Sequence, residues 1–261
     1  MSDGMSMHEW KRYRDILKNI SDKAANDFRD AVWSANGKWK GAGLGNIPRQ
    51  DLIDYAYALV TKYGEGAAAV ACELYDALAE RQGAKVPAAV PAKTASYQKV
   101  AKTVNGTIKQ TINEEVISGA VGRLVKQAGQ DTTLQNAKRD GARVAWVPSG
   151  DTCAFCITLA SKGWQSVKDA AGDDATAKHI HSNCDCAYAV QFDKRFNVQG
   201  YDPGYYAKLY DNAPGKSSKD KINAMRREFY EENKDAINEQ KRSAYEKRKE
   251  RNSSAAEELN V

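Results

Sequence analysis

The first half of the chain repeats its apolar residues at helical spacing. A stripe recurs every three or four positions near the N-terminus, at Trp10, Tyr13, Leu17 and Ile20. This period predicts one amphipathic helix. A glycine-rich stretch without periodicity, 36–45, predicts a loop. Pro48 then opens a predicted helix over 51–63, which Gly64 and Gly66 interrupt before it resumes over 67–81.

The second half mixes helical and alternating patterns. A segment rich in proline and alanine, 86–91, marks a predicted boundary, and 96–128 carries apolar residues spaced close to 3.6, which predicts one or two exposed helices. Alternation predicts strands over 142–147 and 187–192. A short helix over 156–162, ended by Gly163, is expected between them. A polar linker then follows 201–205 up to about Ser218, and 222–251 is charged and helix-prone.

These elements predict a mainly α protein in three parts. A helical N-terminal region spans 1–91, and a charged helical tail follows a linker in 213–261. The middle region, 92–212, contains a small α+β module at about 142–192, whose chemistry sets it apart from the rest of the chain.

That module holds four of the five cysteines, within 34 positions. Cys153 and Cys156 form one close pair, and His181, Cys184 and Cys186 form a second group after a twenty-odd-residue spacer. Each group can direct two ligand atoms toward one metal from a single turn of the chain. The spacer lets the chain fold back, so that both groups reach the same metal. The sequence therefore predicts a Zn²⁺ site, a zinc knuckle that clips two strand ends together. With four protein ligands it would be closed and structural, whereas catalytic zinc keeps one position open.

The pattern offers six candidate ligands to a metal that normally takes four. His181 is better placed than His179, because His181-x2-Cys184 has knuckle-like spacing. Disulfides, free thiols and redox chemistry are the alternatives. A C-x-C disulfide is strained, and the N-terminus lacks the charged-then-apolar pattern of a secretory signal. Cys72 lies in an apolar run, 67–78, and is expected to be an inert buried thiol.

Composition limits the function classes only loosely. The 261 residues permit one or two domains with a real core. Because no apolar run approaches the roughly 18–20 residues of a transmembrane helix, we expect no membrane association. The net charge of +5 is mild but uneven, since 216–251 holds 12 Lys/Arg against 8 Asp/Glu. This tail suits an anionic partner such as DNA, and a solvated helix with i,i+4 charge pairs explains it equally well.

Signatures of common enzyme classes are missing from the sequence. There is no Walker A loop, no H-E-x-x-H and no nucleophile elbow. The zinc deaminase signature needs His-x-Glu before its C-x-x-C, whereas His179 and His181 follow it here. An HNH-type nuclease would need further catalytic residues, and His8 lies far away in sequence. We therefore expect a protein without enzymatic activity.

The stretch 143–192 resembles the MuF-like family, minor head proteins of tailed bacteriophages related to the F protein of phage Mu. The resemblance lies in Val-Pro-Ser-Gly-Asp-Thr-Cys-Ala-Phe-Cys at 147–156 and Leu-Ala-Ser-Lys-Gly at 159–163. It continues in His-Ser-Asn-Cys-Asp-Cys at 181–186 and the Val-x-Phe strand at 190–192. In the family the second half usually reads histidine, two residues, cysteine, one residue, cysteine, and this chain keeps that frame. His179 has no counterpart in the pattern.

The resemblance implies a low-copy minor capsid protein at the portal vertex, acting in head assembly and in genome packaging or delivery. Its implied partners are the portal protein and other capsid proteins, and the basic tail adds packaged DNA bound without sequence preference. The implied location is the virion head, with host cytoplasm during assembly. Two rivals stay open: a nucleic-acid-binding zinc-knuckle protein, and a nuclease or toxin-like enzyme.

Overall fold

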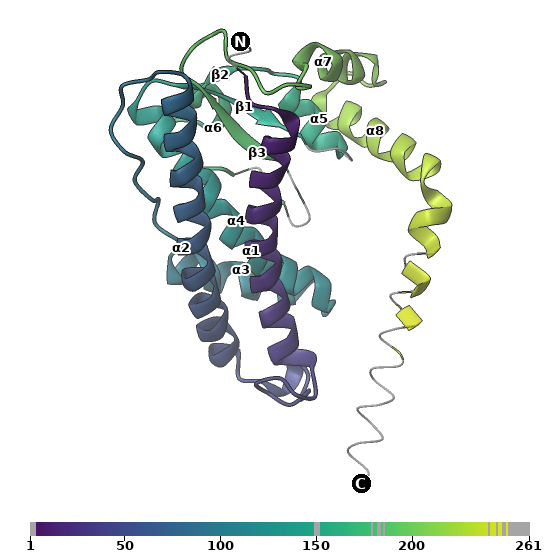
Figure 1. Cartoon of the computed structure of the whole chain (residues 1–261). Helices are drawn as coiled ribbons and strands as arrows, with labels where there is room; N and C mark the ends of the chain where they lie inside the picture. Colours follow the sequence, from purple (N-terminus) through teal and green to yellow (C-terminus); the bar gives the residue numbers. More distant parts are fainter. Residues whose placement is uncertain are drawn as a thin grey trace.

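Helices dominate the chain, and a small sheet lies at one end of the helical bundle (Figure 1). The computed structural model describes residues 4–148, 152–178, 180–181, 184, 186–239, 241–243, 245–246 and 249. Its helices are α1 (Met7–Trp33), η1 (Leu44–Asn46), α2 (Arg49–Arg81), α3 (Tyr97–Gln110), α4 (Glu114–Arg139), α5 (Ala154–Ala160), α6 (Val167–Ala171), α7 (Pro203–Asn212) and α8 (Ser218–Glu232). The strands are β1 (Arg143–Val147), β2 (Gln165–Ser166) and β3 (Ala187–Gln191). The predicted mainly α fold class is confirmed.

Helix α1 begins at a capping box. The Ser6 hydroxyl accepts a hydrogen bond from the Glu9 backbone N–H at 3.2 Å, and the Glu9 carboxylate accepts one from the Ser6 N–H at 2.9 Å. This reciprocal pair satisfies two of the donors that a helix start leaves free. The predicted stripe faces the core, with Trp10 and Leu17 fully buried. The glycine-rich stretch that follows is a loop, as predicted, apart from the single turn of η1.

Helix α2 runs without interruption, so the predicted break at Gly64 and Gly66 is wrong. A glycine inside a helix costs about 1 kcal/mol relative to alanine and does not by itself end the helix. Gly64 has a packing role, because a Cβ there would lie 2.8 Å from the Thr94 methyl carbon. Its missing side chain lets the extended segment before α3 pass close to α2.

Helix α4 is the central helix of the bundle, packed against α1, α2 and α3. The predicted exposure of this region is right for much of α3 but wrong for α4, which is buried over most of its length. Its polar side chains tolerate burial because they have partners in the extended segment. Asn136 donates to the Val90 carbonyl at 2.8 Å, and the Thr132 hydroxyl accepts from the Ala92 N–H at 3.0 Å. Hydrogen bonds of this kind remove the cost of burying polar groups.

The sheet has the order β2-β1-β3, and both pairings are antiparallel. The two predicted strands are confirmed as β1 and β3, whereas the two-residue β2 was not predicted. Trp146 and Tyr188 face each other across the pair, with ring centroids 4.8 Å apart. Every residue of β3 is buried, and β3 packs on α4. The sheet therefore joins the helical bundle through α4.

Helices α7 and α8 lie near the end of the described chain. Helix α7 replaces the predicted polar linker over its residues, because Asp202 caps its start by accepting from the Gly204 N–H at 2.8 Å and Pro203 sets the first turn. Helix α8 contacts α5 and then extends away from the bundle (Figure 1). The predicted helical tail is confirmed over this part. Lys247, Arg248 and Arg251 lie outside the described residues. In the described part, no helix is long and apolar enough to cross a bilayer.

Candidate metal centre

The register of the sheet brings the two groups of predicted ligands together. Val147, the last residue of β1, pairs with Ala187, the first residue of β3. The chain leaves β1 toward Cys153 and enters β3 directly from Cys186, so both groups lie at the same end of this antiparallel pair. Helix α4 packs against both strands, and its Lys126 donates to the Cys184 carbonyl at this end of the sheet.

The first pair is set by the start of α5. Cys153 is the N-cap residue, and its Sγ accepts from the Cys156 backbone N–H at 3.5 Å. Cys156 lies in the first turn, so its thiol points to the same side as that of Cys153. Cys153 is exposed, whereas Cys156 is only 1 % exposed. The pair thus presents one outer and one inner sulfur.

The second group closes on Cys156 from the segment before β3. The His181 Nε2 lies 3.3 Å from the Cys153 Sγ and 3.8 Å from the Cys156 Sγ, while the Cys184 Sγ lies 3.4 Å from that of Cys156. Cys186 completes a second cluster with Cys156 and Cys184 within 4.8 Å. All five predicted ligands therefore gather around Cys156. His179 lies outside the described residues.

These spacings fit a tetrahedral metal. With Zn–S bonds of about 2.3 Å and a Zn–N bond of about 2.0–2.1 Å, a tetrahedron separates two sulfurs by about 3.8 Å and a sulfur from a nitrogen by about 3.6 Å. The observed separations of 3.3–3.8 Å are close to these edges. They are far longer than a disulfide bond of about 2.05 Å, and all five cysteines are free thiols. The donor set of thiols and an imidazole matches the ligands that zinc prefers.

The thiols perturb one another strongly. Hydrogen bonding with the Cys156 thiol, followed by that with His181, lowers the pKa of Cys153 to about 4. Hydrogen bonds from Cys156 and Cys186 likewise lower the pKa of Cys184, while donation to Cys153 and then to Cys184 raises the pKa of Cys156. Thiolates are the metal-binding form of cysteine, so the lowered pKa values of Cys153 and Cys184 favour binding of a cation at these two sulfurs.

Sequence reasoning missed the polar side chains of α4 that hold this module. The Lys126 ammonium donates to the Cys184 carbonyl, and the Gln130 side-chain oxygen accepts from the Tyr188 N–H at 2.8 Å. Asp131 accepts from the Ala177 N–H at 2.6 Å. Partners of this kind fix the ligand loop in place. The sequence gives no signal for them, because their targets are backbone groups distant in the chain.

Cys72 stands apart from the cluster. It lies on α2 and is half-buried, so the expectation of a fully buried thiol is wrong. The preceding residue, Ala71, faces the core. Successive residues of a helix point in different directions, so Cys72 lies at the border between the core and the surface. Burial still raises the pKa of Cys72, which disfavours its reactive thiolate.

The comparison with known families covers most of the chain. The family described as VG15 protein, a family of viral proteins, matches residues 5–213. The chain belongs to the VG15 protein family. No curated protein and no solved structure matches it. The match to the VG15 family spans α1 to α7, and thus both the helical bundle and the candidate metal ligands, whereas α8 lies beyond it.

Proposed function

We propose that this VG15 protein is a minor capsid protein of a tailed phage, associated with the portal vertex and acting in head assembly and in genome packaging or delivery. The observation that carries the proposal is the membership of a viral protein family over residues 5–213. The MuF-like spacing of cysteines and histidine supports the finer assignment, because the ligands it predicts lie together at one end of the sheet. The protein would act by binding and assembly, without catalysis.

The metal in this proposal is a structural Zn²⁺. Four of Cys153, Cys156, His181, Cys184 and Cys186 would hold it, with Cys156 as the common member of both clusters. Zinc supplies bonds between α5 and the segment before β3, which contribute folding free energy to a module with little core of its own. The residues around it hold their positions through α4, where Lys126 and Gln130 bind the backbone on either side of Cys186.

The outer face of α1 and α2 is the surface proposed for the portal contact. The large apolar side chains of α2, including Leu52, Tyr75 and Leu78, are buried within the bundle and are not available to a partner. An outward groove of about 340 Å³ lies between the two helices, lined by Glu9, Arg12, Tyr13, Ile16, Val70, Glu73 and Leu74. Ile16 in this groove is 41 % exposed. We propose this groove as the portal-facing surface.

Gradient-purified particles of the phage that encodes this chain test the assignment. Quantitative mass spectrometry should find the protein in virions at far lower copy than the major capsid protein. Particles assembled with Cys156→Ser should contain less of it, because the change removes the central ligand. Cys72→Ser makes the same chemical change outside the cluster and should be incorporated normally. Complete absence of the unmodified protein from purified particles would refute a virion role.

A second activity, weak DNA binding by the tail, has a separate basis. Helix α8 extends from the bundle, and its aromatic residues Phe229 and Tyr230 are 50 % and 37 % exposed. The helix carries lysines and arginines among its acidic residues. Contacts of these basic side chains with phosphates release counterions, so the binding would weaken as salt rises. Exposed aromatic rings can also stack on unpaired bases. The tail would then hold DNA without reading its sequence.

A further inference from the structure

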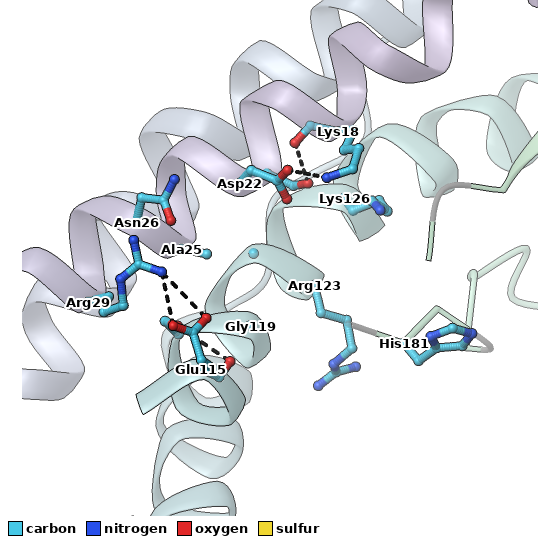
Figure 2. Close-up of a pocket in the computed structure, with 13 residues that line it drawn as sticks. Lys18, Asp22, Ala25, Asn26, Arg29, Glu115, Gly119, Arg123, Lys126 and His181 are labelled. Carbon is cyan, nitrogen blue, oxygen red and sulfur yellow. Dashed lines mark hydrogen bonds and ion pairs between the residues drawn. The ribbon is translucent and has the colours of Figure 1, made fainter. Parts of the chain in front are cut away.

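A polar cavity of about 230 Å³ lies between α1 and α4, beside the metal centre. Its floor consists of small residues, among them Ala25, Gly119 and Gly122. The two helices cross closely here, since a Cβ on Gly122 would lie 2.8 Å from the Ser21 carbonyl oxygen. Figure 2 shows long charged side chains around this floor, with His181 of the ligand segment at one side. The cavity thus results from missing side chains at a helix crossing.

The charges that line the cavity do not balance. Four cationic side chains line it against two carboxylates: Lys18, Arg29, Arg123 and Lys126 against Asp22 and Glu115. Both carboxylates already have partners. Asp22 pairs with Lys18 one turn away on α1, and Glu115 accepts from Arg29 at 3.1 Å across the helix crossing. The remaining positive charge belongs to Arg123 and Lys126, and Lys126 donates to the Cys184 carbonyl.

The Arg123 guanidinium is therefore the positive charge that is available to a ligand. Its side chain extends from α4 into the space before His181 (Figure 2). It is half-buried, and this burial lowers its pKa. Among the described residues it has no hydrogen-bonding or ionic partner. Removing a guanidinium from water without an acceptor is unfavourable, and a bound anion would offset that cost.

We propose that this cavity binds one carboxylate of an acidic segment on a partner protein, with Arg123 as the bidentate donor. The guanidinium presents paired N–H groups that match a carboxylate in a planar fork. A run of phosphates on duplex DNA is disfavoured, because the double helix is too broad to enter a cavity of about 230 Å³. A single aspartate or glutamate side chain is small enough to enter and reach Arg123. Of the five candidate metal ligands, His181 alone lines this cavity, and the proposal goes beyond the proposed capsid role.

The test uses the full-length, zinc-loaded protein and a hexaglutamate peptide with blocked ends, with hexaglutamine as the neutral control. Amide NMR should show saturable shifts for Ala25, Gly119 and Gly122 with hexaglutamate alone. Arg123→Gln should lower the affinity for hexaglutamate by at least about 10-fold, because it removes a charged hydrogen-bond donor. Arg123→Lys keeps the charge and should retain part of the affinity. Arg49→Gln removes an equal charge from an exposed position at the start of α2, outside the cavity, and should change little.

Four readouts make the outcome decisive. The zinc content and the amide spectrum of Arg123→Gln away from the cavity should match the unmodified protein, which separates loss of the pocket from loss of the metal centre. Absence of saturable shifts at these three amides would overturn the proposal. So would shifts that random duplex DNA produces more strongly than hexaglutamate and that Arg123→Gln removes, because the cavity would then be a phosphate site.

Discussion

The crossing of α1 and α4 predicts that one glycine-to-alanine variant is less stable than another. Gly122 lies at the crossing, where an added Cβ would lie 2.8 Å from the Ser21 carbonyl oxygen, whereas ordinary contact begins near 3.4 Å. The helices would have to separate by about 0.6 Å. Gly106 lies within α3, where an added Cβ meets nothing within 4 Å. Both glycines are inside helices, so the gain in helix propensity is common to the two variants.

The size of each effect follows from these contacts. Alanine in place of a helical glycine stabilises by about 1 kcal/mol, and this should appear undiminished in Gly106→Ala. Overpacking at a close contact costs about 1–3 kcal/mol. The free energy of unfolding of Gly122→Ala should therefore be lower than that of Gly106→Ala by this amount. With a change of about 2–4 °C per kcal/mol for a chain of this size, the two melting temperatures should differ by about 2–12 °C.

Differential scanning calorimetry of the zinc-loaded full-length variants measures this difference directly. Circular dichroism should confirm that both keep the helical content of the unmodified chain. If Gly122→Ala melts at or above the temperature of Gly106→Ala, the close crossing of α1 and α4 is wrong, and with it the floor of the polar cavity.

Two further predictions concern a buried carboxyl and the tail. Burial raises the pKa of Asp131 to about 6, so the folded state holds a proton that the unfolded state releases, and the fold loses stability as pH rises through about 4 to 6. Asp131→Asn keeps an acceptor for the Ala177 N–H and should therefore raise the melting temperature more at about pH 8 than at about pH 5; equal shifts would contradict this. A chain ending at Gly215 should bind random duplex DNA more weakly than the full chain at about 50 mM salt, with the difference fading at about 200 mM. Equal affinities of the two chains would leave the tail as a solvated helix.

The clustering of the candidate ligands was predictable because its signal is local. Close pairs of cysteines with a histidine between them are a pattern typical of metal sites, and the flanking alternation indicated β1 and β3. The register that aligns Val147 with Ala187 then brings the pairs together. Which four of the five ligands bind depends on side-chain geometry at the metal, which spacing alone does not determine.

The burial of α4 was not predictable, because its cause is tertiary. Thr132 and Asn136 look like surface residues in a sequence, yet the extended segment before α3 supplies their partners. Gly64 looks like a helix break in the sequence for a related reason. The close approach of Thr94, which explains the glycine, is a tertiary contact. The start of α7 was different: Asp202 followed by Pro203 is a local helix-start signal that sequence analysis passed over.

The metal content of the purified chain tests the central claim most directly. Protein produced under reducing conditions and analysed by native mass spectrometry should carry one zinc ion per chain. Cys156→Ser should lose that zinc and loosen the module around β1 and β3, because metal binding there is folding free energy, while Cys72→Ser should keep both. A zinc stoichiometry near zero for the unmodified chain would contradict the account.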